Sequence, residues 1–331
     1  MTGDRADAER LLEPILALHD SIRDAVVDAC AGQAPEQLAA TAGDAGDTIY
    51  AIDRVGEEAL VHGLSQLARD EPVCVVAEGT PDPLILPRGA RESDCRWRLL
   101  VDPLDGTRGL MYQKRSAWIL TGLAPNRGDA TRLSDIVLAV QTEIPLLKQH
   151  LSDQLWALRG EGMKARRWNR LSGNAEPLML RRSGAETIAH GFATVVRFFP
   201  GAREILAAID DEVVGALVKP EPRRAACFED QYASTGGELY ELMAGHDRFV
   251  ADLRPLVKSA NPLLCCHPYD VCTALIAREA GVIITAGSGA ALDAPFDLTT
   301  DVAWVGYANE PLCGAIEPVL QAALRRRGLL K

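Results

Sequence analysis

The feature that most limits how this chain can fold is an apolar run at residues 97–100 (WRLL) that leads into the acidic stretch 101–110 (VDPLDGTRGL). The run predicts a strand, and the Asp-Pro and Asp-Gly pairs predict that the strand ends in a turn. Two carboxylates, Asp102 and Asp105, stand three residues apart at this strand end. Carboxylates are hard oxygen donors, and Mg²⁺ is commonly held by one or two of them together with substrate phosphate, so the stretch suits a magnesium site.

The residues after the two acids predict a site for an anion. Gly106 lets the backbone approach a ligand closely, and a helix that begins near Thr107 would present free N–H groups to a phosphate. An ordinary surface turn explains the same ten residues, because Asp-Pro and Asp-Gly are common turn dipeptides. The rest of the chain is needed to decide between the two interpretations.

Length, charge and composition exclude several classes of protein. With 331 residues, 47% hydrophobic and 24% charged, the chain is typical of a globular protein of one large domain or two closely packed ones. A net charge of −11 argues against a binder of nucleic acid or of an anionic membrane, since either would need a basic face. The N-terminus has no apolar signal-peptide core, and no apolar run approaches the ~18 residues of a membrane span. We therefore expect a cytoplasmic protein.

The eight cysteines are expected to be free thiols in a reducing compartment. The run Cys265-Cys266-His267 is a candidate for a soft-metal site. No second Cys/His pair stands at the spacing of a zinc finger, which favours a buried or loop position instead.

Alternating helical and strand-like segments predict an α/β protein built in layers. Apolar spacing predicts helices at residues 7–30, 36–41, 203–218, 268–280 and 310–330. A further helix has Asp53 near its start and carries Val55 and Leu67, and another begins near Ser234, stops at Gly245 and is followed by a strand. Strands are expected at 73–76, 97–100, 117–123, 136–140, 154–159, 164–168, 194–198, 282–285 and 302–307, and a loop at 80–94. A composition shift after residue 174 predicts two halves, residues 1–175 and 176–331.

Three further acids stand where α/β proteins place site residues. Asp53 and Asp270 fall in the first turns of predicted helices, and Glu78 follows the strand 73–76. Helix capping or first-turn stabilisation is the more common role of an isolated Asp such as Asp53, and an exposed loop explains Glu78. If these acids and the central pair converged, two like charges ~4 Å apart would cost several kcal/mol at an effective dielectric of about 20. Convergence would therefore require bound cations or protonation.

Three segments then occur in the order, and at roughly the separations, of the inositol monophosphatase family, which the chain resembles. They are AEGT (77–80), DPLDGT (102–107) and YDVCTALIAREAG (269–281), of which DPLDGT is by far the most specific. The match covers residues from about 47 to 310, and the looser superfamily includes fructose-1,6-bisphosphatases and 3′(2′),5′-bisphosphate nucleotidases. The resemblance implies an alternating α-β-α-β-α sandwich with the site between its two halves, and often a homodimer.

The resemblance also implies Mg²⁺-dependent hydrolysis of a phosphate monoester by direct attack of water, with two or three ions. Li⁺ would be expected to inhibit, and Ca²⁺ or Mn²⁺ to substitute in crystals. The implied metal ligands are the carboxylates of Glu78, Asp102, Asp105 and Asp270 and the backbone carbonyl of Leu104. Gly106 and Thr107 would bind phosphate through their N–H groups, and Asp53 with Thr107 would orient the attacking water. The implied substrate contacts are Asp105, Ser234, Thr235, Gly236 and Asp252.

The chain departs from the family pattern at three places. Gly79 replaces a second acid, the loop 42–48 (AGDAGDT) lacks a lysine, and Tyr269 replaces a tryptophan. In that loop, Asp44 and Asp47 are candidates for holding a labile cation, although a solvated loop is favoured. The departures cluster where substrate is selected, so the chemistry is better predicted than the substrate.

Three functions remain open at this point. The leading prediction is a sugar- or polyol-phosphate phosphatase, with inositol monophosphate as the first substrate to test. A bisphosphate phosphatase would need a second basic site, for which Arg223 and Arg224 are candidates, although such a run is more often a solvated loop. A regulatory interaction protein on the same scaffold is the alternative from another class.

Overall fold

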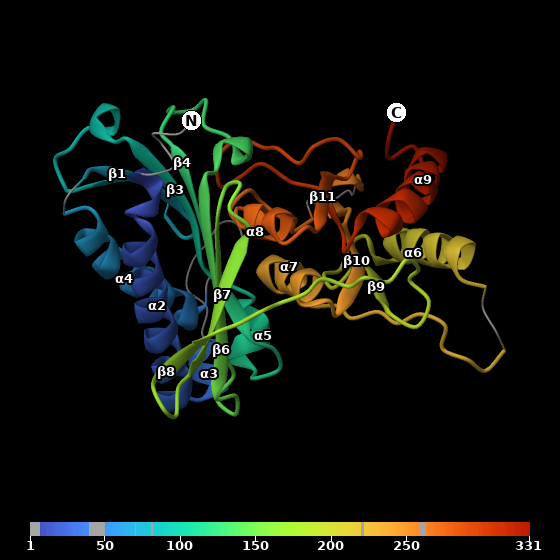
Figure 1. The fold of residues 1–331 in the computed structure, drawn as a ribbon, viewed down its shortest axis with the longest axis horizontal. Helices are drawn as coiled ribbons and strands as arrows, with labels where there is room; N and C mark the ends of the chain where they lie inside the picture. The colour runs from blue at the N-terminus through green and yellow to red at the C-terminus, as the bar shows by residue number, and fades with distance from the viewer. Residues whose placement is uncertain (1–6, 40–49, 70, 81, 220–221, 259–262) are drawn as a thin grey trace.

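Helices and sheets alternate in five layers in the computed structural model, which describes residues 7–39, 50–69, 71–80, 82–219, 222–258 and 263–331 (Figure 1). Helices α2 (Leu12–Gly32) and α4 (Ala51–Leu67) cover one face of an eight-stranded sheet. Helices α7 (Thr235–Ala244) and α8 (Ala274–Glu279) lie between this sheet and a four-stranded one, whose far side is covered by α6 (Arg203–Leu217) and α9 (Glu310–Arg326). The predicted α/β class and α-β-α-β-α order are confirmed.

The large sheet brings two strand ends of the predicted site together. Its strand order is β2-β1-β3-β4-β5-β6-β7-β8, and only β1 and β3 run parallel. In their register Ala77 lies beside Val101, so Glu78 and Asp102, the next residues, emerge side by side at one edge. The strands are β1 (Val73–Ala77), β2 (Leu84–Leu86), β3 (Trp97–Asp105), β4 (Ala117–Pro125), β5 (Leu138–Ile144), β6 (Leu151–Leu158), β7 (Met163–Asn169) and β8 (Asn174–Pro177).

Both faces of the central strands β1, β3, β4 and β5 are buried, which explains their nearly continuous apolar runs in the sequence. Leu99 and Val101 of β3 join the hydrophobic cluster under α2 and α4, whereas Leu100 between them joins the cluster around α7 and α8. In β4, Ile119 joins the cluster under α2 and α4, and Leu120 joins the cluster around α7 and α8. Successive strand residues point to opposite faces, so a strand covered on both sides must be apolar throughout.

The small sheet completes the second half of the sandwich. Its order is β11 (Ile283–Ala286), β12 (Trp304–Tyr307), β10 (Asp247–Asp252) and β9 (Phe192–Val195). The division predicted between residues 175 and 176 falls inside β8, which still pairs with β7 in the large sheet. One hydrophobic cluster contains residues of both sheets and of the helices between them. The two halves therefore share a core, and their separation into domains stays a prediction.

Some predicted elements differ from the structure or lie outside it. The segment 80–94, expected to be a loop, contains the short edge strand β2, which pairs with β1. The short helix expected at 36–41 is α3 (Pro35–Leu38), and residues 40–41 lie outside the described residues. The loop with Asp44 and Asp47 also lies outside them. None of the helices in the described part of the chain is long and apolar enough to cross a membrane.

Candidate active site

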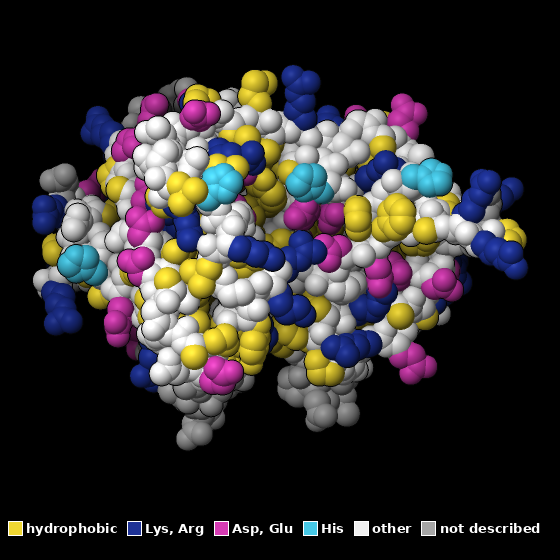
Figure 2. Space-filling view, turned by 90° about the horizontal axis from the view of Figure 1, so that it is seen from below, with side chains coloured by type: hydrophobic (Ala, Val, Ile, Leu, Met, Phe, Trp, Pro, Cys, Tyr) yellow, Lys and Arg dark blue, Asp and Glu magenta, His cyan; other side chains and the backbone are white. Residues whose placement is uncertain are grey.

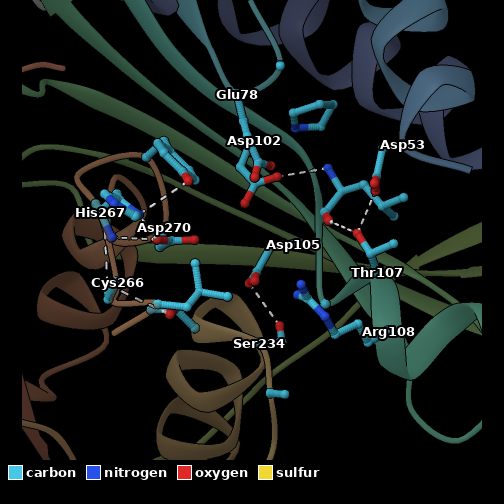
Figure 3. Close-up of a pocket in the computed structure, with 18 of the residues that line it drawn as sticks. Asp53, Glu78, Asp102, Asp105, Thr107, Arg108, Ser234, Cys266, His267 and Asp270 are labelled. Atoms are coloured by element: carbon cyan, nitrogen blue, oxygen red, sulfur yellow. Dashed lines mark hydrogen bonds and ion pairs between the residues drawn. The ribbon is translucent and has the colours of Figure 1, made fainter. Parts of the chain in front are cut away.

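Three carboxylates from the two halves of the chain meet in one cavity of about 400 Å³. Ligand oxygens of Asp102, Asp105 and Asp270 lie within 4.8 Å of one another (Figure 3). Glu78 lines the same cavity, although its carboxylate lies outside this 4.8 Å group. Acidic side chains accordingly gather near the middle of the face seen in Figure 2. The structure thus brings together the four acids that the sequence predicted as metal ligands.

A bulge in β3 turns Asp102 and Asp105 to the same side of the sheet. Asp102 pairs with Leu120 and Asp105 with Trp118, so the ladder carries one extra residue on β3. Pro103 has no N–H with which to continue the ladder. In an unbroken strand, side chains three residues apart point to opposite faces. The extra residue reverses the alternation, which explains how the spacing Asp-Pro-Leu-Asp produces a pair of neighbouring carboxylates.

The carboxylate cluster is only partly compensated within the described residues, because the charge of Arg254 lowers the pKa of Asp270 against stronger effects that raise it. Burial, and then the nearby Glu78, raises the pKa of Asp102 well above its ordinary value. Burial raises the pKa of Asp105 to about 6, against the opposing effect of its hydrogen bonds. Burial and the charge of Asp105 likewise raise the pKa of Asp270. No described lysine or arginine forms an ion pair with these three carboxylates, and the ring of His267 lies 3.9 Å from Asp270. Hard, crowded oxygen donors of this kind fit Mg²⁺.

Two residues of the second half position Asp105. Its Oδ2 accepts hydrogen bonds from Ser234 Oγ at 2.8 Å and from the Gly236 N–H at 2.6 Å. Ser234 Oγ also accepts from the Gly237 N–H at 3.0 Å and so caps α7, as predicted. A β-carbon on Gly236 would stand 2.6 Å from Leu120 Cδ2 and 3.0 Å from Asp105 Oδ2, so any larger residue there would force its neighbours to shift. Thr235 lines the cavity. Contact of these residues with substrate stays a prediction.

Asp53 and Thr107 are joined by a short hydrogen bond. Thr107 Oγ1 lies 2.7 Å from Asp53 Oδ1 and 3.0 Å from the Leu104 carbonyl oxygen. Asp53 Oδ2 accepts the Tyr50 N–H at 2.7 Å, at the start of α4. Asp53 therefore caps its helix and also contacts Thr107, and its role in orienting water stays a prediction. Gly106, with a φ of 96°, precedes the short helix α5 (Thr107–Met111), as predicted.

Asp270 reaches the cavity by a different route from the one predicted. The helix expected over 268–280 begins only at Ala274, and residues 268–273 form successive turns. In these turns Asp270 Oδ2 accepts the His267 N–H at 2.6 Å, and the Asp270 N–H donates to the His267 carbonyl at 3.1 Å. This reciprocal pair holds the carboxylate over the cavity. The prediction that Asp270 lies in the first turn of an α-helix is wrong.

Asp252 was expected to contact substrate, but it does not line the cavity. It is 0% exposed and bonds Arg254 twice, Oδ1 at 2.9 Å from Nε and Oδ2 at 2.5 Å from Nη2. Arg254, and not Asp252, lines the cavity. Arg223 and Arg224 are exposed and do not line it.

Sequence reasoning missed several cavity residues. Glu57 lies one helical turn after Asp53 on α4, and this spacing predicts a shared face. Arg108 directly follows Thr107. Phe198 and Phe199 had no local signal, because only the fold brings them to the cavity. All eight cysteines lie in the described part of the chain and are free, and Cys265 and Cys266 are buried, as expected.

Comparison with solved structures identifies the fold. The extragenic suppressor protein suhB from Bartonella henselae matches with a TM-score of 0.65 at 18% identity, over 94% of this chain and 98% of that one. Fructose-1,6-bisphosphatase from Leishmania major matches with a TM-score of 0.67 at 16% identity, over 96% and 94%. This chain has the inositol monophosphatase and fructose-1,6-bisphosphatase fold.

A third structure with this inositol monophosphatase fold comes from Pyrococcus horikoshii. It is described as a hypothetical protein with similarities for inositol-1 monophosphatase, and it matches with a TM-score of 0.62 at 17% identity, over 95% of this chain and 98% of that one. No family model and no curated protein sequence matches the chain. At such low identity the fold is shared, and the chemistry has to be argued from the site.

Proposed function

We propose that the protein is a Mg²⁺-dependent phosphatase that hydrolyses a sugar or polyol phosphate monoester by direct attack of water. The observation that carries the proposal is the buried group of Asp102, Asp105 and Asp270 beside the turn of Gly106 and Thr107. A cluster of acids that repel one another is costly for the fold unless it has a cation to bind. A fructose-1,6-bisphosphatase among the structural neighbours supports chemistry on a phosphate ester.

Each group of site residues would have a distinct role in the reaction. The carboxylates of the acid cluster, Glu78 and the Leu104 carbonyl would hold the metal ions, which when bound neutralise phosphate charge and make water more acidic. The N–H groups of Gly106 and Thr107 would hold phosphoryl oxygens. Thr107 Oγ1 donates to Asp53 Oδ1, so the hydroxyl oxygen can accept a proton from the attacking water as its own proton passes to Asp53. Water attacks phosphorus, the ester P–O bond breaks, and the leaving oxygen takes a proton from solvent and departs as the alcohol, after which Asp53 returns its proton to solvent.

The direct test is phosphate release from a panel of phosphate esters, inositol monophosphate included, with and without Mg²⁺. Asp102→Asn should lower Mg²⁺-dependent release at least roughly a hundredfold and leave the protein folded. Asp129→Asn, which removes an exposed acid outside the cavity, is the matched control. Unchanged release by the Asp102 variant, with a native circular dichroism spectrum, would overturn the proposal. Added Li⁺ should inhibit, and Mn²⁺ and Ca²⁺ should be tested in place of Mg²⁺.

The two alternatives lead to different results in the same assays. A bisphosphate phosphatase would prefer esters with two phosphates, but it would have to use cations other than the exposed Arg223 and Arg224. A regulatory interaction protein would release phosphate from none of the esters. Light scattering at several protein concentrations would test the predicted homodimer.

A further inference from the structure

Part of the cavity wall is cationic and aromatic. We define the arginine wall as Arg108, Phe198, Phe199 and Arg254, all of which line the cavity. Arg108 belongs to α5, the two phenylalanines follow β9, and Arg254 follows β10. The guanidinium carbons of Arg108 and Arg254 lie 5.2 Å and 5.3 Å from the centre of the Phe199 ring. A single ring therefore brings two cations from distant segments to one place.

Arg254 is fixed before any ligand binds. Its Nε and Nη2 donate to the two oxygens of Asp252, and its Nη1 donates to the Leu264 carbonyl at 2.8 Å. Its guanidinium carbon also lies 4.6 Å from the centre of the Phe198 ring. Arg254 is only 4% exposed, and Asp252 is fully buried behind it. Because the Arg254 side chain is already ordered, little further side-chain entropy is lost when it binds a ligand.

The phenylalanine rings favour an anion over a planar base as the group that this wall binds. Each ring has a guanidinium within cation–π distance, so the rings hold the arginines in place. A ring face covered by a guanidinium is closed to a stacking base. Guanidinium N–H donors instead match the oxygens of carboxylate and phosphate groups.

The arginine wall borders the acid cluster on one side of the cavity. In Figure 3, Arg108 lies beside Asp105 and Ser234, on the side of the cavity away from Glu78. Figure 2 shows Lys and Arg side chains beside the central acidic group on this face. A second anion among the acids would be repelled unless a cation neutralised it, whereas near the arginines it would be attracted.

We propose that Arg108 and Arg254 bind a second anionic group, a carboxylate or a second phosphate, on the phosphate ester that the acid cluster hydrolyses. The inference rests on the proposed phosphatase function and narrows its substrate class to anionic sugar or polyol phosphates. Neutral polyol phosphates are then poor substrates, because they bring no second anion to the arginine wall.

The test compares esters that differ only in the second group. Gluconate 6-phosphate and glucitol 6-phosphate differ at C1, a carboxylate in one and an alcohol in the other, and fructose 1,6-bisphosphate and fructose 1-phosphate differ by one phosphate. We expect kcat/KM to be at least about tenfold higher for the anionic member of one pair, mainly through KM. The pair with the larger ratio identifies the second group as carboxylate or phosphate.

Substitutions in the wall should lower that preference. Arg108→Gln is expected to reduce the ratio of kcat/KM values at least about fivefold. Arg254→Lys should do the same, because it keeps a positive charge against Asp252 but loses the guanidinium fork. Arg224→Gln removes an equal charge outside the cavity and is the matched control, expected to keep the native ratio.

Two results would overturn this inference and leave the proposed phosphatase function intact. One is turnover by the native protein without preference in either pair. The other is an equal loss for both members of a pair in Arg108→Gln, which would place this arginine at the scissile phosphate. If the native protein hydrolyses none of the esters with Mg²⁺, the proposed function itself fails, and the inference falls with it.

Discussion

The carboxylate of Glu57 occupies the space in which a side chain at position 79 would begin. A β-carbon built on Gly79 would meet Glu57 Oε1 far inside the distance at which two atoms can approach. Gly79 also has a φ of 80°, which favours glycine. Position 79 is where the family pattern places its second acid. In this chain a carboxylate comes to the same space from α4, and we propose that it takes the place of the missing acid.

Glu57→Gln should therefore weaken the response to metal. We expect the Mg²⁺ concentration for half-maximal phosphate release to rise roughly tenfold, as happens when a carboxylate that supports a metal site is removed. Burial and the charge of Asp53 raise the pKa of Glu57, so the neutral variant should fold normally. Glu58→Gln changes the exposed neighbour and serves as the control. An unchanged Mg²⁺ response in the Glu57 variant would contradict the assignment.

Ser234→Ala should reduce activity as well as stability. The variant loses the cap of α7, worth about 1 kcal/mol, and one of the bonds that hold Asp105. A carboxylate free to move should lower kcat by roughly tenfold or more, and Ser234→Thr should restore part of it. Thermal unfolding and steady-state kinetics measure the two effects.

The control for Ser234 is another helix cap. Asn309 caps α9 by accepting the Leu312 N–H at 2.9 Å, and it does not line the cavity. Asn309→Ala should lower the melting temperature and leave kcat near native. Equal losses of kcat in the Ser234 and Asn309 variants would mean that stability alone explains both.

Local chemistry made much of the site predictable. The acids at strand ends and the glycine before Thr107 follow from short-range patterns that the structure keeps, and the start of α7 near Ser234 was predicted from its neighbours alone. What the pattern does not contain is the pairing of β1 with β3, which places Glu78 beside Asp102.

The errors have the same origin, since they depend on tertiary contacts. Asp252 was assigned to substrate because its burial and its partner Arg254, two residues away, could not be known. The helix before Ala274 was overextended because the Asp270 carboxylate, bonded to the His267 N–H, stabilises turns in its place. Phe198 and Phe199 reach the cavity only when the small sheet packs on the central helices.

Thr107 and Asp53 should act as one unit. Thr107→Val keeps the shape of the side chain but removes the hydroxyl, and should lower kcat about a hundredfold or more. Asp53→Asn should have a similar effect, and the double variant should be little worse than either single variant. Thr107→Ser retains the hydroxyl and should stay within about tenfold of native. Additive losses of kcat in the double variant would show that the two residues act independently.

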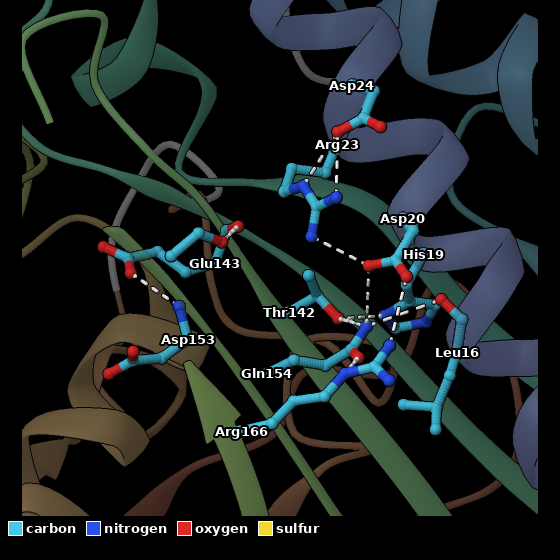
Figure 4. A network of polar contacts seen from close by, with 11 residues as sticks. Leu16, His19, Asp20, Arg23, Asp24, Thr142, Glu143, Asp153, Gln154 and Arg166 are labelled. Carbon is cyan, nitrogen blue, oxygen red and sulfur yellow. Dashed lines mark hydrogen bonds and ion pairs between the residues drawn. The ribbon is translucent and has the colours of Figure 1, made fainter. Parts of the chain in front are cut away.

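A buried histidine joins α2 to the large sheet (Figure 4). His19 is 0% exposed, with Nδ1 2.9 Å from Thr142 Oγ1 and Nε2 2.8 Å from Thr121 Oγ1. Gln154 Nε2 donates to the same Thr142 hydroxyl at 2.8 Å. Burial, and then the charge of Arg23, lowers the pKa of His19 to about 3, so this ring is neutral in the folded protein.

This histidine should make the fold sensitive to acid. Below the ordinary histidine pKa of 6.5 the unfolded chain binds a proton at His19, whereas the folded chain does not bind it until about pH 3. The contribution of His19 to stability is therefore complete above pH 6.5 and falls by about 1.4 kcal/mol per pH unit below it. The buried acids with raised pKa values change stability in the opposite direction, so the native protein alone does not isolate the effect of His19. The quantity to measure is the difference in unfolding free energy between the native protein and His19→Gln. Urea titrations at pH 8, 6, 5 and 4 give this difference. That difference should shift steadily against the native protein as pH falls below 6.5, and His62→Gln, at an exposed histidine, is the control variant. A constant difference for His19→Gln would mean that the ring binds protons equally in the folded and the unfolded chain.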